Sequence, residues 1–181
     1  MKNDDETRVI LVDENDKQTG TAEKMEAHKK ALLHRAVSVF IINSKGEWIL
    51  QKRAFEKYHS NGLWTNTCCT HPFPGESNIG SAKRRLKEEM GIDCELQELF
   101  SFTYKEKLDN ELTEFEFDHV FFGVSDNPPA INLSEVEAWQ AITFEDLHDN
   151  IQTNPENYTI WFKKIYERVY SHITINKNIL L

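Results

Sequence analysis

The stretch NTCCTHPFPGES, residues 66–77, gathers side chains that carry chemistry: adjacent cysteines, a histidine and a glutamate. Its spacing differs from the C-x-x-C pairs of zinc knuckles and redox motifs. The chain has three cysteines, an odd number that gives no disulfide framework. The stretch therefore raises the question of why one residue separates Cys69 from His71, directly ahead of a charged helix.

That helix is predicted over residues 76–92, where apolar residues repeat at helical spacing, Ser77 or Asn78 can cap the start and Gly91 ends it. Arginines stand four residues before glutamates, a spacing typical of commonplace surface ion pairs. A second interpretation is that the helix carboxylates bind a hard cation such as Mg²⁺, which bridges carboxylates to substrate phosphates. The pairs are Arg84–Glu88 and Arg85–Glu89, and the candidate cation ligands are Glu76, Glu88 and Glu89.

A second carboxylate pair, Glu114 and Glu116, lies two residues apart on a predicted strand, so both side chains point to one side. One interpretation is a cation site facing a cavity. The other is a solvated polar face, with Phe115, Phe117 and Phe121 turned to the core. The alternation fits both interpretations.

Two further histidines, His28 and His34, are six residues apart. On one straight helix they would diverge by about 240°. They converge only if the helix ends between them, and a strand predicted from His34 allows this.

Elements that position these residues follow from apolar patterning and turn signals. The irregular stretch 55–75 is long enough to indicate a functional loop. Strands, a helix, further strands and a last helix predict an α+β fold, a mixed sheet with flanking helices. The expected strands are 8–13, 34–43, 48–54, 95–108, 112–125 and 136–143, with a turn at 14–20, and the expected helices are 23–33, 76–92, 144–151 and 154–173.

The 181 residues fit one domain, 1–181, with ends 1–6 and 173–181 expected to be flexible. A net charge of −9 argues against sequence-independent nucleic-acid binding, while leaving room for a local phosphate site. The longest apolar run, residues 36–42, is far shorter than the ~20 residues of a membrane helix. With no signal-like segment at the start, the cytoplasm is the expected compartment, without membrane partners.

The predicted helix resembles the Nudix box, G-x5-E-x7-R-E-U-x-E-E-x-G-U, where U is aliphatic. The resemblance implies a Nudix-like α/β/α sandwich. Thr70 stands where the first glycine belongs, and Arg85 replaces a glutamate that Nudix hydrolases use to assemble their metal centre. Both departures weaken a hydrolase interpretation. The matching residues are Glu76, Arg84, Leu86, Glu88, Glu89, Gly91 and Ile92.

Nearly the whole chain resembles a more specific family, type I isopentenyl diphosphate isomerase. The W-T-N-x-x-C-x-H-P element and the E-x-E pair are its most specific features. The matching segments, in the family's order, are TGTAEKMEAH, LLHRAVSVF, QKRAFEK, GLWTNTCCTHP, GES with RRLKEEMG, FTYK, TEFEFDHVF and YTIWF.

The resemblance implies interconversion of isopentenyl and dimethylallyl diphosphate through a carbocation-like intermediate, in isoprenoid biosynthesis. It also assigns roles. The implied metal ligands, for Mn²⁺, Mg²⁺ or Zn²⁺, are His28, His34, His71, Glu114 and Glu116. Glu89 is implied to hold Mg²⁺ together with the diphosphate, which is contacted by Lys24, Arg53, Lys57 and Arg85. The implied catalytic residues are Cys69, Glu116, Tyr104 and Trp161.

In the forward direction we expect the Glu116–Tyr104 side to protonate the alkene and Cys69 to remove the other proton, with Trp161 stabilising the cation. Cys68 and Cys94 are interpreted as small buried fillers. Two alternatives are a Nudix hydrolase of a nucleoside diphosphate derivative and a non-catalytic binding module. The pattern fits a monomer and a homodimer equally.

Overall fold

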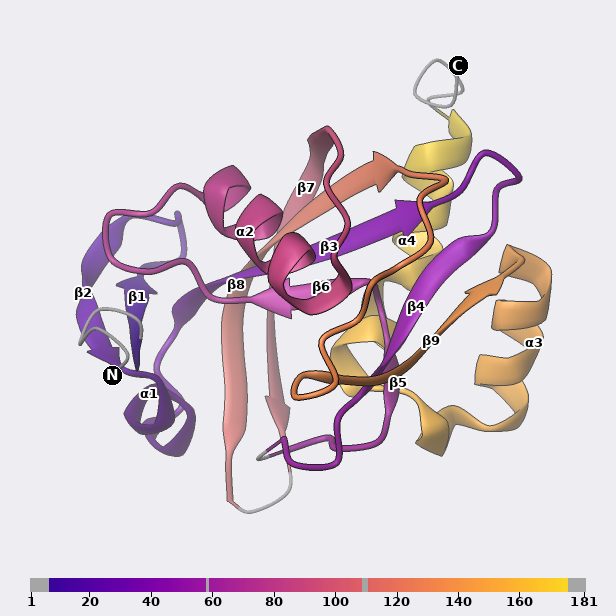
Figure 1. Cartoon of the computed structure of the whole chain (residues 1–181). Coiled ribbons are helices and arrows are strands. Elements are labelled where there is room, and N and C mark those ends of the chain that lie inside the picture. The colour runs from indigo at the N-terminus through magenta and orange to yellow at the C-terminus, as the bar shows by residue number, and fades with distance from the viewer. Residues whose placement is uncertain (1–6, 58, 109–110, 176–181) are drawn as a thin grey trace.

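The computed structural model describes residues 7–57, 59–108 and 111–175 (Figure 1). Of the ends expected to be flexible, 1–6 and 176–181 lie outside the described residues, while 173–175 form the last turn of the final helix. The elements are β1 (Arg8–Val12), β2 (Gln18–Glu23), α1 (Lys24–Lys30), β3 (His34–Ile42), β4 (Trp48–Arg53), β5 (Trp64–Thr65), β6 (Cys68–Thr70), α2 (Asn78–Met90), β7 (Leu96–Lys107), β8 (Thr113–Val124), β9 (Val136–Ile142), α3 (Phe144–Thr153), η2 (Pro155–Asn157) and α4 (Ile160–Ile175).

Strand β3 is the centre of the sheet. It pairs in parallel with β8 along its whole length, from His34 to Ile42. It pairs antiparallel with β6 and, at one end, with β4. Strand β7 extends the sheet beyond β8, and β9 extends it beyond β4, whose other edge pairs with both β3 and β5. The sheet is therefore mixed, which confirms the α+β prediction.

Both faces of β3 are covered, so residues 36–42 are apolar on both faces except at Ser38. Val39 and Ile41 pack with Leu86 of α2 in one buried cluster. Phe40 packs with Phe162 of α4 in the other. Helix α2 lies on one side of the sheet and α4 on the opposite side, which confirms the predicted sandwich (Figure 1).

Helix α2 has the predicted ends. The Ser77 hydroxyl accepts a hydrogen bond from the Gly80 amide at 3.1 Å. Gly91 follows the helix with φ 67°, a left-handed conformation that favours glycine. A Cβ at Gly91 would lie 2.7 Å from the Ala130 carbonyl oxygen. Both the left-handed backbone conformation and the close packing against Ala130 therefore favour glycine at this position.

Two local predictions were wrong, and one predicted helix is shorter than expected. The turn predicted over 14–20 contains the start of β2, which pairs with β1. The stretch 55–75 is not wholly irregular, because it holds β5 and β6. The helix predicted over 23–33 covers only Lys24–Lys30. Strands of two or three residues exist through their partners, which local patterning does not specify. Among the described residues, no helix is both long and apolar enough to cross a membrane.

Candidate active site

A cavity enclosing about 600 Å³, solvent at its mouth included, lies beside β3. The cavity brings together eleven of the predicted site residues: Lys24, Arg53, Lys57, Cys69, His71, Arg85, Glu89, Tyr104, Glu114, Glu116 and Trp161. His28 and His34 lie behind this wall, fully buried, and contact His71.

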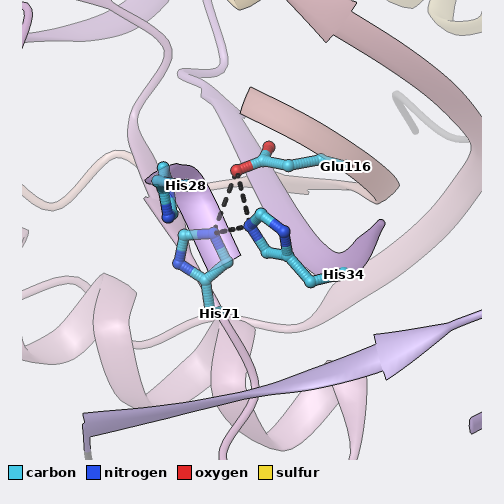
Figure 2. Close-up of side chains that lie close together, drawn as sticks. All are labelled: His28, His34, His71 and Glu116. Carbon is cyan, nitrogen blue, oxygen red and sulfur yellow. Dashed lines mark hydrogen bonds and ion pairs between the residues drawn. The ribbon is translucent and has the colours of Figure 1, made fainter. Parts of the chain in front are cut away.

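Three imidazoles and one carboxylate face a common centre (Figure 2). The His71 Nε2 atom lies 2.9 Å from Glu116 Oε1 and 3.2 Å from His34 Nε2. One ligand atom from each of His28, His34, His71 and Glu116 lies within 4.8 Å of all the others. The arrangement provides donors for a single metal ion.

Local backbone geometry explains why His28 and His34 converge. Helix α1 ends at Ala31, whose φ of 51° turns the chain, and β3 begins at His34. The two ring centroids are then 4.9 Å apart. Glu116 reaches the same centre because it is paired with His34 across β3 and β8. The convergence predicted for a helix that ends between the histidines is confirmed.

The donor set fits a divalent cation. His28 Nδ1 lies 2.7 Å from the Lys24 carbonyl oxygen, and His34 Nδ1 lies 2.8 Å from that of Leu32. Each Nδ1–H donates to its carbonyl, so each Nε2 presents a lone pair to the centre. Burial, followed by the charge of His34, lowers the pKa of His28 to about 4. Neutral imidazoles beside a carboxylate are ordinary metal ligands.

Glu114 and Glu116 are 4% and 6% exposed, so they do not form a solvated polar face. Phe115 and Phe117 are only half-buried, and Phe121 alone packs in a core cluster. The Tyr104 hydroxyl lies 2.6 Å from Glu116 Oε2 and 3.0 Å from Glu114 Oε2. Of the two interpretations of this strand, the structure supports carboxylates that face a cavity.

The two buried carboxyl groups titrate in opposite directions. Burial and the neighbouring charge of Glu116 raise the pKa of Glu114 well above its usual range. Burial would also raise the pKa of Glu116, but the His34 and His71 imidazoles beside it outweigh burial and hold that pKa well below its usual range. Glu116 is therefore the ionised member of the pair, and Tyr104 bridges it to Glu114.

A chain of ion pairs includes three residues that line the cavity, Lys57, Arg85 and Glu89. Lys57 pairs with Glu135, and Arg85 Nη2 lies 3.2 Å from the same carboxylate oxygen. Arg85 also pairs with Glu89, which accepts a hydrogen bond from the Gln51 amide at 2.9 Å. Two cations thus alternate with two carboxylates.

Of the three α2-region carboxylates considered as cation ligands, only Glu89 lines the cavity. Glu76 instead forms a two-pronged pair with Arg84, at 2.7 and 2.9 Å. Glu88 pairs with Arg84 and Arg85 and is 45% exposed. The surface-pair interpretation is thus right for Glu88, and the cation interpretation is left with Glu89 alone.

The adjacent cysteines have different environments because β6 turns successive side chains to opposite faces. Cys68 is fully buried in the cluster under α2, as expected for a filler. The Cys69 thiol faces the cavity, 3.2 Å from Asn66 Oδ1 and 3.8 Å from Ser38 Oγ. Burial, followed by the charge of Asp118, raises the pKa of Cys69 to about 12. Cys69 is therefore a thiol at neutral pH.

The NUDIX domain profile matches residues 32–168. The chain is 50% identical to the isopentenyl-diphosphate Delta-isomerase of Pectobacterium atrosepticum, over 90% of this chain and 91% of that protein. The chain belongs to the isopentenyl-diphosphate Delta-isomerase family. A second member, isopentenyl-diphosphate Delta-isomerase 2 of Aromatoleum aromaticum, is 47% identical over 94% of this chain and 90% of its own. The resemblance drawn from the sequence motifs is confirmed.

Solved structures show that this member of the isopentenyl-diphosphate Delta-isomerase family has the Nudix fold. The crystal structure of DR0079 from Deinococcus radiodurans matches with a TM-score of 0.75, covering 90% of this chain and 99% of its own. The MutT protein of Methanosarcina mazei Go1 matches with a TM-score of 0.62, covering 75% and 91%. Identities of 21% and 19% limit both likenesses to the fold.

Sequence motifs missed three residues of this family member's site. Glu135 joins the ion pairs from the segment before β9, and His59 lines the cavity from the loop before β5. Asp118 is buried behind Ser38, whose hydroxyl donates to it at 2.7 Å. Asp118 follows Glu114 and Glu116 at strand spacing, so alternation could have indicated it. No local signal indicates Glu135 or His59.

Proposed function

We propose that this protein interconverts isopentenyl diphosphate and dimethylallyl diphosphate. The proposal rests on the family of its relatives and on one observation in particular. The cavity holds the thiol of Cys69, on β6, and the carboxylate of Glu116, on β8, which is hydrogen-bonded to a tyrosine. Strands β6 and β8 pair with opposite edges of β3. Moving a double bond requires a proton donor at one carbon and an acceptor at another, which this pair provides.

In the reaction, a proton adds to the terminal alkene carbon, and the adjacent tertiary carbon becomes cationic. A neighbouring C–H bond then breaks, its electron pair forms the new double bond, and its proton goes to the base. Tyr104 and Cys69 both rest protonated, because burial raises the pKa of each. If Glu116–Tyr104 is the acid in the forward direction, Cys69 must be the base and must therefore be a thiolate, which burial disfavours. The opposite assignment, with Cys69 as the acid and ionised Glu116 as the base, agrees with the protonation states at rest.

Diphosphate binding is assigned to Lys24, Arg53, Lys57 and Arg85. Two of these cations, Lys57 and Arg85, are already paired with the carboxylates of Glu135 and Glu89. A diphosphate therefore needs added positive charge, and Mg²⁺ held by Glu89 suits this need.

The histidine centre is assigned to a divalent ion, Mn²⁺, Mg²⁺ or Zn²⁺, with His28, His34, His71, Glu114 and Glu116 as ligands. Such an ion, when bound, supplies positive charge that sets the proton affinity of Glu116. The Tyr104 hydroxyl, which keeps its proton, lies 2.6 Å from Glu116 Oε2.

Trp161 is assigned to stabilise the developing cation. Its ring is buried at 3% exposure and lines the cavity. The Arg53 guanidinium already lies 5.3 Å from the ring centroid, so this ring accepts a cation. An aromatic face offers no lone pair that would trap a carbocation, and its burial keeps out water.

The experiment is incubation with isopentenyl diphosphate and Mg²⁺ in deuterated water, followed by mass analysis of products. Isomerisation predicts deuterium in a product that keeps its diphosphate. Released phosphate from nucleoside diphosphate derivatives would instead support the hydrolase alternative, against which Arg85 and Thr70 argue. Metal binding without conversion of any substrate would support a binding module.

A further inference from the structure

His59 adjoins the histidine centre, although no motif includes it. Its side chain is 6% exposed and lines the cavity wall. Its Nε2 atom lies 3.9 Å from Glu114 Oε1, and its ring centroid lies 6.1 Å from that of His28. One ligand atom from each of His28, His59 and Glu114 lies within 4.8 Å of the other two. This makes a second potential metal-binding group beside the first.

His59 is oriented in the same way as two members of the first group. His28 Nδ1 and His34 Nδ1 bond to backbone oxygens, and His59 Nδ1 lies 3.3 Å from Ser60 Oγ. Holding Nδ1 fixes the ring and aims Nε2 at a metal. Ser60 has φ 49°, a left-handed conformation uncommon for residues other than glycine. The loop therefore adopts an uncommon backbone conformation next to His59.

The two groups share His28, which decides how they can be used. Its Nδ1 is committed to the Lys24 carbonyl oxygen at 2.7 Å, so only Nε2 can ligate. One Nε2 lone pair binds one ion, and the two groups cannot hold two ions at the same time. A single ion with ligands from both groups requires their side chains to draw together when it binds, because the ligand atoms of the two groups do not all lie within 4.8 Å of one another.

We propose that His59 is a fourth imidazole ligand of the ion held by His28, His34, His71 and the two glutamates. The inference rests on the metal centre of the proposed function and deepens it. Four imidazole nitrogens make the set nitrogen-rich, and imidazole favours transition metals over Mg²⁺. The centre therefore takes a first-row transition ion, and Mg²⁺ is left to the diphosphate at Glu89.

The test is a titration of the EDTA-treated full chain with Co²⁺, followed by visible absorption and calorimetry. His59→Gln is expected to weaken Co²⁺ binding at least tenfold and to change the visible spectrum. His172→Gln is the matched control, because that ring stacks on Phe100 at 4.7 Å and does not line the cavity. It is expected to match wild type. An unchanged affinity and spectrum in His59→Gln overturns the inference, even if that variant loses catalytic rate.

X-ray absorption of the Co²⁺-loaded wild type gives an independent answer if His59→Gln does not fold. Four imidazole ligands support the inference, and three overturn it while leaving the histidine centre intact. A wild type that binds no Co²⁺ overturns the centre and the inference together. The deuterium experiment tests isomerisation separately, so the failure of each idea is recognisable.

Discussion

The Tyr104 hydroxyl lies 2.6 Å from Glu116 Oε2, and the two residues face each other across β7 and β8. Because β8 also pairs with β3, this contact joins the cavity's proton-carrying hydroxyl to a carboxylate of the histidine centre. Glu114 Oε2 lies 3.0 Å from the same hydroxyl. Tyr104 is thus the one phenol placed to pass a proton between the centre and a bound alkene among the residues lining the cavity.

Tyr104→Phe keeps the ring and removes this hydroxyl. We expect the rate of isomerisation to fall about 10²-fold, a typical contribution of general acid–base catalysis, with little change in KM. Steady-state kinetics together with deuterium incorporation measures both quantities. The ring of Phe102 stacks on that of Tyr104, with centroids 5.4 Å apart. Adding Phe102→Tyr to the Tyr104→Phe variant tests whether a displaced hydroxyl restores the rate. A Tyr104→Phe rate within twofold of wild type would contradict the assignment.

The adjacent cysteines form a matched pair for mutation. Cys69→Ala is expected to lower the isomerisation rate by at least about 10²-fold without loss of fold, because it removes the cavity thiol. Cys68→Ala is expected to keep the rate and to lower the free energy of unfolding by about 1 kcal/mol, because it leaves a small void under α2. Activity assays and urea denaturation of both variants separate the two effects. The reverse pattern would exchange the proposed roles.

Stability of the metal-free protein is expected to fall in mild acid. Burial, followed by the charge of His34 for His28 and of Arg53 for His59, lowers the pKa of His28 to about 4 and that of His59 to about 3, from the ordinary histidine value of 6.5. A lowered folded-state pKa gives stability that is complete above pH 6.5 and is lost as the pH falls toward 4. Each group contributes a slope of about 1.4 kcal/mol per pH unit in that window.

Urea denaturation at several pH values between 7 and 4 measures this slope after EDTA treatment. His59→Gln removes one titrating group and should have a shallower slope than wild type. His172→Gln should keep the wild-type slope. Equal slopes in all three proteins would show that burial of His59 does not affect its protonation.

Glu135→Gln is expected to loosen the metal requirement of diphosphate binding. Its Oε2 atom holds both Lys57 and Arg85, so loss of the charge leaves these cations available to an anion. Calorimetry with inorganic pyrophosphate in EDTA should show about tenfold tighter binding than wild type, a gain of about 1.4 kcal/mol. Glu95→Gln is the control, because its pair with Lys83 is on the surface and Glu95 is 95% exposed. Unchanged or weaker binding by Glu135→Gln contradicts the expectation.

The sequence alone determined the direction of side chains within each element. Strand alternation put Glu114 and Glu116 on one side, since this period follows from the backbone itself. Capping residues and glycine fixed the ends of α2 in the same local way. Family motifs added nearly all of the cavity wall, because they carry residue spacings that a shared fold preserves.

Tertiary structure decided which elements meet. His28, His34 and His71 share a centre with Glu116 only because β8 pairs in parallel with β3 and β6 pairs along its other edge. Glu135 and His59 reach the site from loops, where no periodicity predicts a direction. Patterning describes each element relative to its own axis, whereas the distance between two side chains depends on strand pairing and packing far along the chain. That is why the metal centre could be expected as a set of ligands, but His59 and the pairing of Glu135 with Lys57 could not.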